Sequence, residues 1–371
     1  MTDPLRVGMN VLWLRPGIVG GTESYATRLI TALADRPEVL MHTFALPEAA
    51  SLHRGALAIT NVHQAPDLPD HPSARIAAER TWLIRELRAL DADVVHHLGG
   101  TVPVGSPGPL VCTIHDLQPL DDPGNFSAIK RRWLGRALPA AVRRSTIVAA
   151  PSQWVADQIS ERLDIDPAHV VTVSAYADGS DDPTETQPDR EHPFVLFPAM
   201  TLAHKNHRFL FDAFARAVQK RPDLRLVCVG ATGRDDHDIR HYAADASSRI
   251  EMRGHVSRAE FDDLLHHAEA LVFPSLYEGF GLPVVEAQIA GVPVIASNRT
   301  ALPEVAGTGA VLLDPTDVDV WADAMAAPLP ASTRDELVAQ GRVNAQRYSA
   351  AEMATSQLRA YRLAQSTSPA P

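Results

Sequence analysis

The sequence has only two cysteines and no long hydrophobic run, and these two shortages argue against a disulfide-rich protein and against a membrane-spanning one. Its two cysteines, Cys112 and Cys228, stand in apolar, strand-like stretches. A disulfide framework is therefore excluded, and two buried thiols in a reducing cytoplasm are expected. No run of about 18 apolar residues occurs, so no membrane-spanning helix is expected. The first residues, MTDPLRVGMNVLWL, lack the basic and apolar regions of a signal peptide, which predicts a cytoplasmic protein.

Acidic residues outnumber basic ones, and most of the basic residues are arginines. The 371 residues carry a formal net charge of −11, whereas a protein that binds duplex nucleic acid usually has a basic face and a high pI. We therefore expect no nucleic-acid partner. Lysine occurs only at Lys130, Lys205 and Lys220, among 34 basic residues. A lysine kept in so arginine-rich a chain suggests a site that needs a compact ammonium group.

Strand and helix patterns alternate twice along the chain, on either side of an acidic, proline-containing segment at 178–193. Such alternation predicts parallel βαβ units. We expect an α/β fold of two doubly wound Rossmann-like domains, at 1–177 and 194–349, which are joined by the linker 178–193 and face a central cleft. The tail, 333–365, has a helical pattern throughout. Ligands of such sheets bind beyond the carboxyl ends of the strands.

The expected elements follow from apolar periodicity. Expected strands cover 6–13, 40–46, 93–99, 110–116, 145–151, 169–175, 194–200, 224–230, 270–275, 292–297 and 310–315. Expected helices cover 25–36, 78–90, 128–144, 152–163, 207–221, 258–268, 283–290 and 318–327.

The strongest candidate site is the stretch SLYEGFGLPVVEAQIAGVPVIAS, in which Glu278 and Glu286 are eight residues apart. Pro283 suits the first turn of a helix, so Glu278 should lie in the loop before that helix and Glu286 about one turn inside it. Carboxylates there can accept hydrogen bonds from vicinal hydroxyls of a ribose or hexose, while backbone N–H groups at the helix start suit a diphosphate. A solvated glutamate beside a Gly/Pro loop is the alternative.

Three further segments carry weaker signals. Lys205, preceded by His204, follows an expected strand and opens a helix, where an ammonium can neutralise a diphosphate; a solvated lysine is the alternative. Gly20 and Gly21 follow the first strand and permit close approach of backbone to a ligand, although they do not form a GxGxxG fingerprint. His115 should end a buried strand, where it could position or deprotonate an acceptor hydroxyl; a hydrogen-bonded loop histidine is the alternative. His96, His97, His266 and His267 are expected to be structural.

These motifs resemble those of the retaining glycosyltransferases of family 4, which have the GT-B fold. The resemblance is carried by Glu278 to Glu286 with the following GVPVIAS and LPEVAG, by HKN around Lys205, by the early GGTES and by HD at Asp116. It runs from about residue 6 to residue 365. It implies that the C-terminal helix, about 350–371, returns to the first domain.

The resemblance also implies roles for these residues. Glu286 would bind the ribose of a nucleotide-diphosphate sugar, Glu278 would hold hydroxyls of the transferred sugar, and Lys205 would neutralise the diphosphate. Gly21 would approach the donor from the first domain. His115 would lie near the anomeric centre and, with Asp116, near the acceptor. Backbone donors to the phosphate and sugar would come from Gly279, Phe280, Gly281 and Leu282. Base contacts would come from Gly254, His255 and Val256.

Two positions depart from the family pattern. Many members have an arginine several residues before the lysine, where this chain has Met200 and Thr201. The diphosphate site would then carry less positive charge unless His204 is protonated by the bound diphosphate. The aromatic residue often found near the start of the last helix is also missing, and YSAAE stands there.

The expected chemistry is retaining hexosyl transfer to a hydroxyl of a glycan, a lipid-linked glycan or a small molecule, catalysed by His115, Lys205 and Glu278. The favoured reaction is mannosyl- or rhamnosyl-type transfer, and the favoured pathway is the biosynthesis of a cell-surface polysaccharide or glycoconjugate. No DxD-like or His/Cys cluster has metal-ligand spacing, so no metal or other cofactor is expected. The alternatives are a paired-carboxylate glycosidase, a natural-product glycosyltransferase and a nucleotide-sugar-binding partner subunit without activity.

One basic segment suggests a further partner. Residues 126–144 hold six basic residues and no acidic one. Such a stretch could contact an anionic membrane at its inner face, or a lipid-diphosphate acceptor. A solvated helix face explains the same pattern and is preferred.

Overall fold

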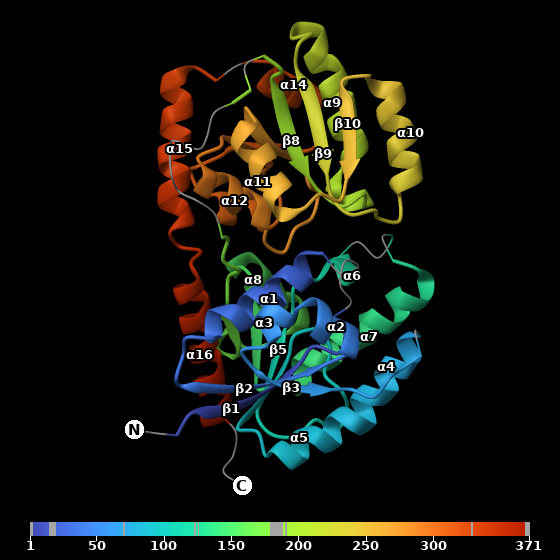
Figure 1. Ribbon diagram of the computed structural model, residues 1–371, viewed down its shortest axis with the longest axis vertical. Coiled ribbons are helices and arrows are strands. Elements are labelled where there is room, and N and C mark those ends of the chain that lie inside the picture. The colour runs from blue at the N-terminus through green and yellow to red at the C-terminus, as the bar shows by residue number, and fades with distance from the viewer. Residues whose placement is uncertain are drawn as a thin grey trace. The chain divides into compact units, whose positions relative to one another are not determined.

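The computed structural model describes residues 3–14, 20–69, 71–121, 124, 126–178, 188–189, 191–327 and 329–367. The chain forms two compact units. The first unit is Met1–Tyr176 with Ala350–Pro371, and the second unit is Ala177–Ser349. Each contains a parallel sheet with helices on its faces (Figure 1), so the prediction of two doubly wound α/β units is confirmed.

The sheet of the first unit has the strand order β3-β2-β1-β4-β5-β6-β7, and every pair in it is parallel. The order reverses between β1 and β4, which makes the carboxyl ends of these two strands the place where a ligand site is expected. The strands are β1 (Leu5–Asn10), β2 (Val39–Ala45), β3 (Asn61–Gln64), β4 (Val94–His97), β5 (Leu110–Thr113), β6 (Ile147–Ala150) and β7 (Val170–Thr172).

Helices connect these strands, and their ends follow from local sequence. Ser127 begins α7 and Ser152 begins α8, each accepting a hydrogen bond from a first-turn N–H group, as serine does at an N-cap. The helices are α1 (Gly21–Leu33), α2 (Pro47–Leu52), α3 (Arg54–Leu57), α4 (Pro72–Ala78), the π-helix η1 (Glu79–Leu83), α5 (Ile84–Leu90), α6 (Gln118–Asp121), α7 (Ala128–Arg144), α8 (Gln153–Leu163) and the 3₁₀ helix η3 (Pro167–His169).

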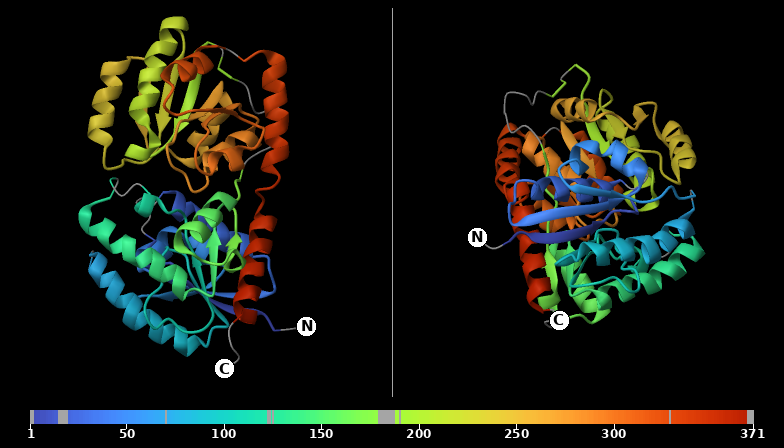
Figure 2. Two further views of the ribbon diagram at one scale, coloured as in Figure 1. Left: turned by 180° about the vertical axis from the view of Figure 1, so that it is seen from behind. Right: turned by 60° about the horizontal axis from the view of Figure 1, so that its bottom comes forward.

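The last helix, α16 (Ala350–Thr367), belongs to the first unit. It packs against α1 and against strands β4 to β7, and both views of Figure 2 show it lying along this unit. Its Tyr361 is fully buried, and the hydroxyl lies 2.9 Å from Nδ1 of His96. Nε2 of His96 lies 2.8 Å from Oγ1 of Thr113. The return of the C-terminal helix to the first domain is therefore confirmed.

The sheet of the second unit has the order β10-β9-β8-β11-β12-β13, again with parallel pairs throughout. Here the order reverses between β8 and β11. The strands are β8 (Phe194–Pro198), β9 (Arg225–Val229), β10 (Ile250–Gly254), β11 (Ala270–Phe273), β12 (Val294–Ser297) and β13 (Val311–Leu313). The helices are the 3₁₀ helix η4 (Ala203–Lys205), α9 (His207–Lys220), α10 (Asp236–Ala246), α11 (Arg258–His267), α12 (Leu282–Ala290), α13 (Leu302–Ala306), α14 (Val318–Ala326) and α15 (Ala331–Ala345).

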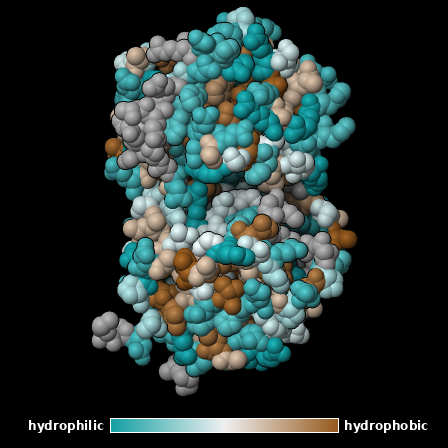
Figure 3. Space-filling model, in the orientation of Figure 1, coloured by the Kyte–Doolittle hydropathy of each residue, from teal (hydrophilic) through white to brown (hydrophobic). Residues whose placement is uncertain are grey.

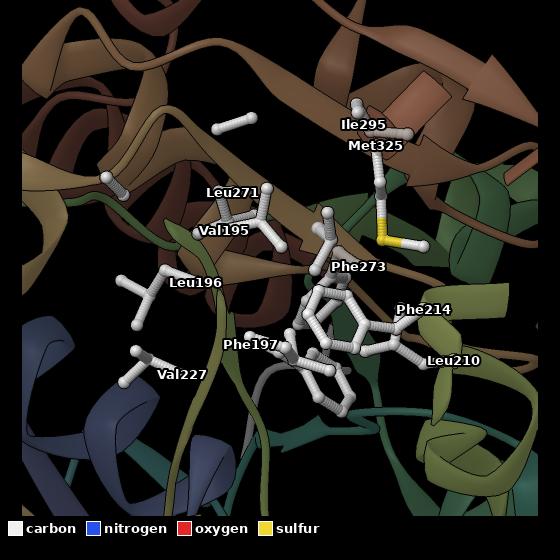
Figure 4. Close-up of a cluster of buried hydrophobic side chains, with 14 of the residues drawn as sticks. Val195, Leu196, Phe197, Leu210, Phe214, Val227, Leu271, Phe273, Ile295 and Met325 are labelled. Atoms are coloured by element: carbon white, nitrogen blue, oxygen red, sulfur yellow. The ribbon is translucent and has the colours of Figure 1, made fainter. Parts of the chain in front are cut away.

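The core of the second unit lies between this sheet and helices such as α9 and α14. Phe197 and Phe273, from the two strands at the reversal, pack edge to face with ring centroids 6.4 Å apart. Phe214 of α9 and Met325 of α14 join the same cluster (Figure 4). This apolar layer fixes the ends of β8 and β11, from which the loops of the candidate site extend.

The structure differs from the expected elements in the tail and in several elements that were not expected, helix α10 among them. The tail is not one helix, because α15 ends at Ala345 and α16 starts at Ala350, in the other unit. Strands β3 and β10 were not expected. Both are edge strands, and neither is fully buried along its length, so neither has the apolar run by which the inner strands are found.

Both cysteines are buried and unpaired, as expected. In the described part of the chain, no helix is both long and apolar enough to cross a bilayer. The face shown in Figure 3 carries hydrophobic residues in small groups among hydrophilic ones.

Candidate functional site

Two loops of the second unit meet at the reversal of its strand order. One follows β8 and contains Lys205, and the other follows β11 and contains Glu278. They are joined by a backbone hydrogen bond from Leu276 N to His204 O of 2.8 Å. Asn206, in the left-handed conformation (φ 65°), donates from Nδ2 to the carbonyl oxygens of Pro274 and Pro315. An asparagine tolerates this conformation better than most residues, and it fixes the loop that presents Lys205.

Lys205 and Glu278 form an ion pair. Nζ of Lys205 lies 2.6 Å from Oε1 of Glu278, and the two side chains are 18% and 12% exposed. The same ammonium lies 5.5 Å from the ring centroid of Phe273, which favours a cation. The structure thus brings together two of the residues singled out from the sequence, although 73 positions separate them.

Positive charge in this loop affects a neighbouring histidine. Burial, followed by the charges of Lys205 and His204, lowers the pKa of His207 to about 4. His207 is buried at the start of α9 and is therefore neutral at pH 7. The predicted donor ligand His204 is half-buried in η4 beside Lys205.

The loop before α12 is held in a conformation that requires glycine. Gly281 has φ +107°, and a Cβ there would lie 2.6 Å from Cδ2 of Leu302. Phe280 is buried edge to face against Tyr348, with ring centroids 5.2 Å apart, while Gly279 and Leu282 are half-buried. Pro283 lies in the first turn of α12, as predicted. The first N–H groups of a helix have no intrahelical acceptor, so this turn suits an anion.

Thr300 supports the same loop from the neighbouring strand connection. Its backbone is left-handed (φ 55°), which is strained for a β-branched residue. Its Oγ1 accepts a hydrogen bond of 3.0 Å from the backbone N of Glu278. Strain of this kind often accompanies a functional site, and no sequence signal had singled out Thr300.

Glu286 lies one turn inside α12, as predicted, and it has a partner that the sequence did not suggest. Its carboxylate is 6% exposed, and Oε1 lies 2.6 Å from Nη1 of Arg258. Arg258 is the first residue of α11. The two residues are 28 positions apart, with no motif between them that predicts contact. Both predicted donor carboxylates therefore lie against a cation within the second unit.

The expected base-binding stretch lies at the end of β10. Gly254 has φ +76°, and its carbonyl accepts a hydrogen bond of 2.8 Å from Gly230 N, which follows β9. His255 is exposed, while Val256 is partly buried against the core of the second unit. The stretch thus lies at the carboxyl end of the edge strand β10, next to the end of β9.

In the first unit, glycines again lie at the reversal of strand order. Gly20 has φ 61° and begins α1, and its carbonyl accepts from Glu23 N and Ser24 N. Among the described residues, a Cβ at Gly21 would meet no atom within 4 Å. Gly99, after β4, was not singled out from the sequence, yet a Cβ there would collide with the ring of Trp13.

His115 follows β5 at the same edge, as predicted, and its ring is anchored. Nε2 lies 2.8 Å from the carbonyl oxygen of Leu98. A carbonyl only accepts, so Nε2 carries the proton and Nδ1 is the basic nitrogen. The ring also packs edge to face on Tyr25, with centroids 5.0 Å apart. Burial lowers the pKa of His115 to about 4, which makes it a weak base at neutral pH and favours a positioning role.

Other polar residues at this edge have structural partners. Oδ1 of Asp116 accepts a hydrogen bond of 2.9 Å from Gln118 N, at the start of α6. His97 is fully buried, with Nδ1 3.2 Å from Asn10 and Nε2 2.8 Å from Ser106. His96 and His97 thus lie inside the protein, whereas the acceptor role of Asp116 stays a prediction. Across the described residues, no three His, Cys, Asp or Glu side chains are arranged to hold a metal ion.

Two family models match the chain, one over each half. The Glycosyltransferase Family 4 model matches residues 19–178, and the Glycosyl transferases group 1 model matches residues 192–329. Among curated relatives, O-antigen chain mannosyltransferase B of Escherichia coli is 29% identical over 268 residues, which cover 68% of this chain and 70% of the relative. MMP alpha-(1->4)-mannosyltransferase of Mycolicibacterium hassiacum is 31% identical, over 65% of this chain and 64% of the relative.

Solved structures share the fold over nearly the whole chain. The structure of Anabaena Alr3699/HepE in complex with UDP and glucose matches with a TM-score of 0.73 at 16% identity, covering 96% of this chain and 98% of that one. At that identity, the likeness concerns the fold. Together with the two family models, it shows that this chain is a glycosyltransferase of family 4 with the GT-B fold.

Proposed function

We propose that this enzyme transfers a hexosyl unit from a nucleotide-diphosphate sugar to a hydroxyl acceptor and retains the anomeric configuration. The observation that carries the proposal is the ion pair of Lys205 and Glu278 on the two loops that follow β8 and β11. These loops lie at the reversal of the strand order, where nucleotides bind in doubly wound sheets. An ammonium for the diphosphate and a carboxylate for sugar hydroxyls are what such a donor requires.

The proposed mechanism is front-face substitution. The nucleoside diphosphate leaves, positive charge builds at the anomeric carbon, and the acceptor hydroxyl attacks from the side of the leaving group. The proton of this hydroxyl would pass to an oxygen of the departing diphosphate. Lys205 and the first N–H groups of α12 would stabilise the departing diphosphate. Glu278 would hold sugar hydroxyls, and Glu286 the ribose. His115, neutral at pH 7, would orient the acceptor hydroxyl through Nδ1.

The favoured sugar is mannose or a similar hexose. The names of the relatives from E. coli and M. hassiacum both specify mannosyltransferases, and the first also specifies the O-antigen chain. This supports transfer to a saccharide or lipid-linked acceptor in cell-surface polysaccharide biosynthesis. A natural-product glycosyltransferase has the same site chemistry, and a nucleotide-sugar-binding subunit without activity would bind the donor and transfer nothing.

We further propose that the enzyme works in the cytoplasm and contacts an anionic membrane through α7. On this helix Ile129 is 85% exposed and Trp133 is 39% exposed, among exposed basic residues. Beside it, a groove of about 250 Å³ has apolar walls and arginines such as Arg136 and Arg144 along it. Exposed tryptophan and arginine together are typical of an anionic lipid interface. Co-sedimentation with anionic liposomes that is unchanged in a K130A/R131A/R132A variant would contradict this contact.

One set of experiments tests the main proposal. A thermal-shift panel of UDP, GDP, dTDP and ADP identifies the nucleotide, and the matching sugar donors are then assayed for transfer. NMR of the product determines whether the anomeric configuration is retained. Full activity in a chelator is expected, since no metal is assigned a role. Inversion, strict metal dependence, or tight nucleotide binding without any transfer would contradict the corresponding part of the proposal.

A further inference from the structure

Arg258 ties three segments of the second unit together around a predicted donor ligand. Its Nη1 lies 2.6 Å from Oε1 of Glu286 on α12. Its Nη2 donates to the backbone carbonyl of Asp178 at 3.0 Å. Asp262, one turn along α11, accepts a hydrogen bond of 3.0 Å from Nε, and its Oδ1 lies 2.8 Å from Nη2 in an ion pair.

The guanidinium is the group that this geometry needs. Its donors point in fixed directions within one plane and can therefore serve several acceptors at once. A lysine ammonium is a single point and would not reach all three partners. The start of α11 is itself fixed, because Oγ of Ser257 accepts a hydrogen bond of 3.2 Å from Glu260 N. Arg258 is therefore committed to protein partners.

The carboxylate of Glu286 needs favourable partners, because it is only 6% exposed. A carboxylate withdrawn from water is costly without a cation or hydrogen bonds. The Arg258 pair supplies a cation and also restricts the directions in which the carboxylate oxygens point.

We propose that Arg258 is a positioning residue that holds Glu286 in the orientation that binds the nucleotide of the donor. This inference rests on the proposed function, since it assigns Glu286 to the donor. Arg258 acts through Glu286 and is not expected to contact the sugar or the reacting atoms. Loss of Arg258 should therefore weaken donor binding more than it slows the chemical step.

The test compares four variants with the wild type: R258M, R258K, E286Q and R258M/E286Q. R258M is expected to raise the donor KM, and the Kd of the best nucleoside diphosphate from the panel above, by about tenfold, since it leaves a carboxylate that is only 6% exposed without its cation, although Arg258 itself is 45% exposed. The kcat at saturating donor should change by less than about threefold. In the E286Q background, R258M should add little, because coupled residues are not additive.

R221M provides a matched control. Arg221 forms a two-bond pair with Glu269, of 2.6 and 2.7 Å, in the same unit. Glu269 directly precedes β11, so this pair lies at the amino end of the sheet, opposite the candidate site. R221M is expected to lower stability and to leave donor KM and Kd unchanged. R258K, which keeps the charge, is expected to give an intermediate KM and serves if R258M fails to fold.

The outcomes separate this inference from the proposed function. If the wild type neither binds any nucleoside diphosphate nor transfers from its sugar donors, the proposed function fails. If the wild type binds and transfers, but R258M and R258K keep the wild-type Kd and KM, the role of Arg258 is refuted. It is equally refuted if R258M has its full effect in the E286Q background.

Discussion

Nζ of Lys205 lies 2.6 Å from Oε1 of Glu278, so the ammonium assigned to the diphosphate and the carboxylate assigned to the sugar form one ion pair. A diphosphate that binds this ammonium must either share the ammonium with Glu278 or displace the Glu278 carboxylate from it. Donor binding would then release or reorient the Glu278 carboxylate at the moment when sugar hydroxyls arrive. Under the proposed function, the pair would therefore link recognition of the phosphate to recognition of the sugar.

The first prediction concerns this ammonium. Lys205→Ala should lower kcat about 100-fold or more, because removing one group that stabilises a developing negative charge costs around 3 kcal/mol. Steady-state kinetics with the identified donor measures the effect. Lys220→Ala is the control, since Lys220 forms an exposed pair with Asp323 on α14, and it should keep wild-type turnover. Near-wild-type turnover of Lys205→Ala would refute the diphosphate assignment.

The second prediction separates two glycines by their backbone surroundings. Gly281→Ala should lower the free energy of unfolding by about 1–3 kcal/mol, because φ is +107° and the new Cβ would lie 2.6 Å from Leu302. Gly21→Ala should not destabilise the protein, because its Cβ would meet no atom of the described residues within 4 Å and the residue is helical. Urea unfolding measures both.

Gly21→Ala also tests whether the backbone of Gly21 lies close to the donor, the role assigned to it above. If its backbone closely approaches the donor, Gly21→Ala should lose activity while it keeps full stability. Wild-type kinetics for Gly21→Ala would remove Gly21 from the donor site and would leave the structural prediction for Gly281 unaffected.

The sequence was sufficient for the parts of the fold that depend on local pattern. Buried strands such as β8 and β11 were predicted from apolar runs, and the start of α12 from Pro283. Parallel strands share one carboxyl edge, and the loops with Lys205 and Glu278 meet at that edge. The polar edge strand β10 was missed because Glu251 and Arg253 interrupt its apolar pattern.

Contacts between distant segments were beyond the sequence. The pair of Arg258 and Glu286 depends on where α11 lies against α12, and no spacing rule within either helix encodes that packing. The left-handed Thr300 that supports Glu278 was missed for the same reason, since its conformation is imposed by neighbours. Local periodicity predicts which elements form, whereas partners across elements follow from packing.

The third prediction concerns pH. Burial lowers the pKa of His96 and His97 to about 3 and that of His115 to about 4, below the ordinary value near 6.5. Unfolded histidines therefore bind protons that folded ones do not. The contribution of these neutral rings to the free energy of unfolding is fully present above about pH 6.5. It is lost as pH falls toward 4, at up to about 1.4 kcal/mol per pH unit for each histidine.

Urea unfolding at pH 7.5, 6.5 and 5.5 measures this loss. His115→Gln should reduce the slope of unfolding free energy against pH by about the contribution of one histidine. His237→Gln, at a side chain that is 98% exposed, should leave the slope unchanged. A wild-type stability that stays constant between pH 7.5 and 5.5 would contradict the burial of these rings.

The fourth prediction concerns the docking of α16 on the first unit. Tyr361→Phe removes the hydroxyl that lies 2.9 Å from Nδ1 of the buried His96. An unsatisfied buried polar group costs about 1–3 kcal/mol, so the first unit should unfold at lower urea concentration. Tryptophan fluorescence suits this measurement, because four of the five tryptophans, all except Trp321, belong to the first unit. Tyr242→Phe, which removes a hydrogen bond to Asp212 in an exposed pair of the second unit, should have little effect on that signal. If the two variants unfold alike, the His96 contact does not hold α16 in place, and apolar packing of residues such as Met353 and Leu358 must account for its docking.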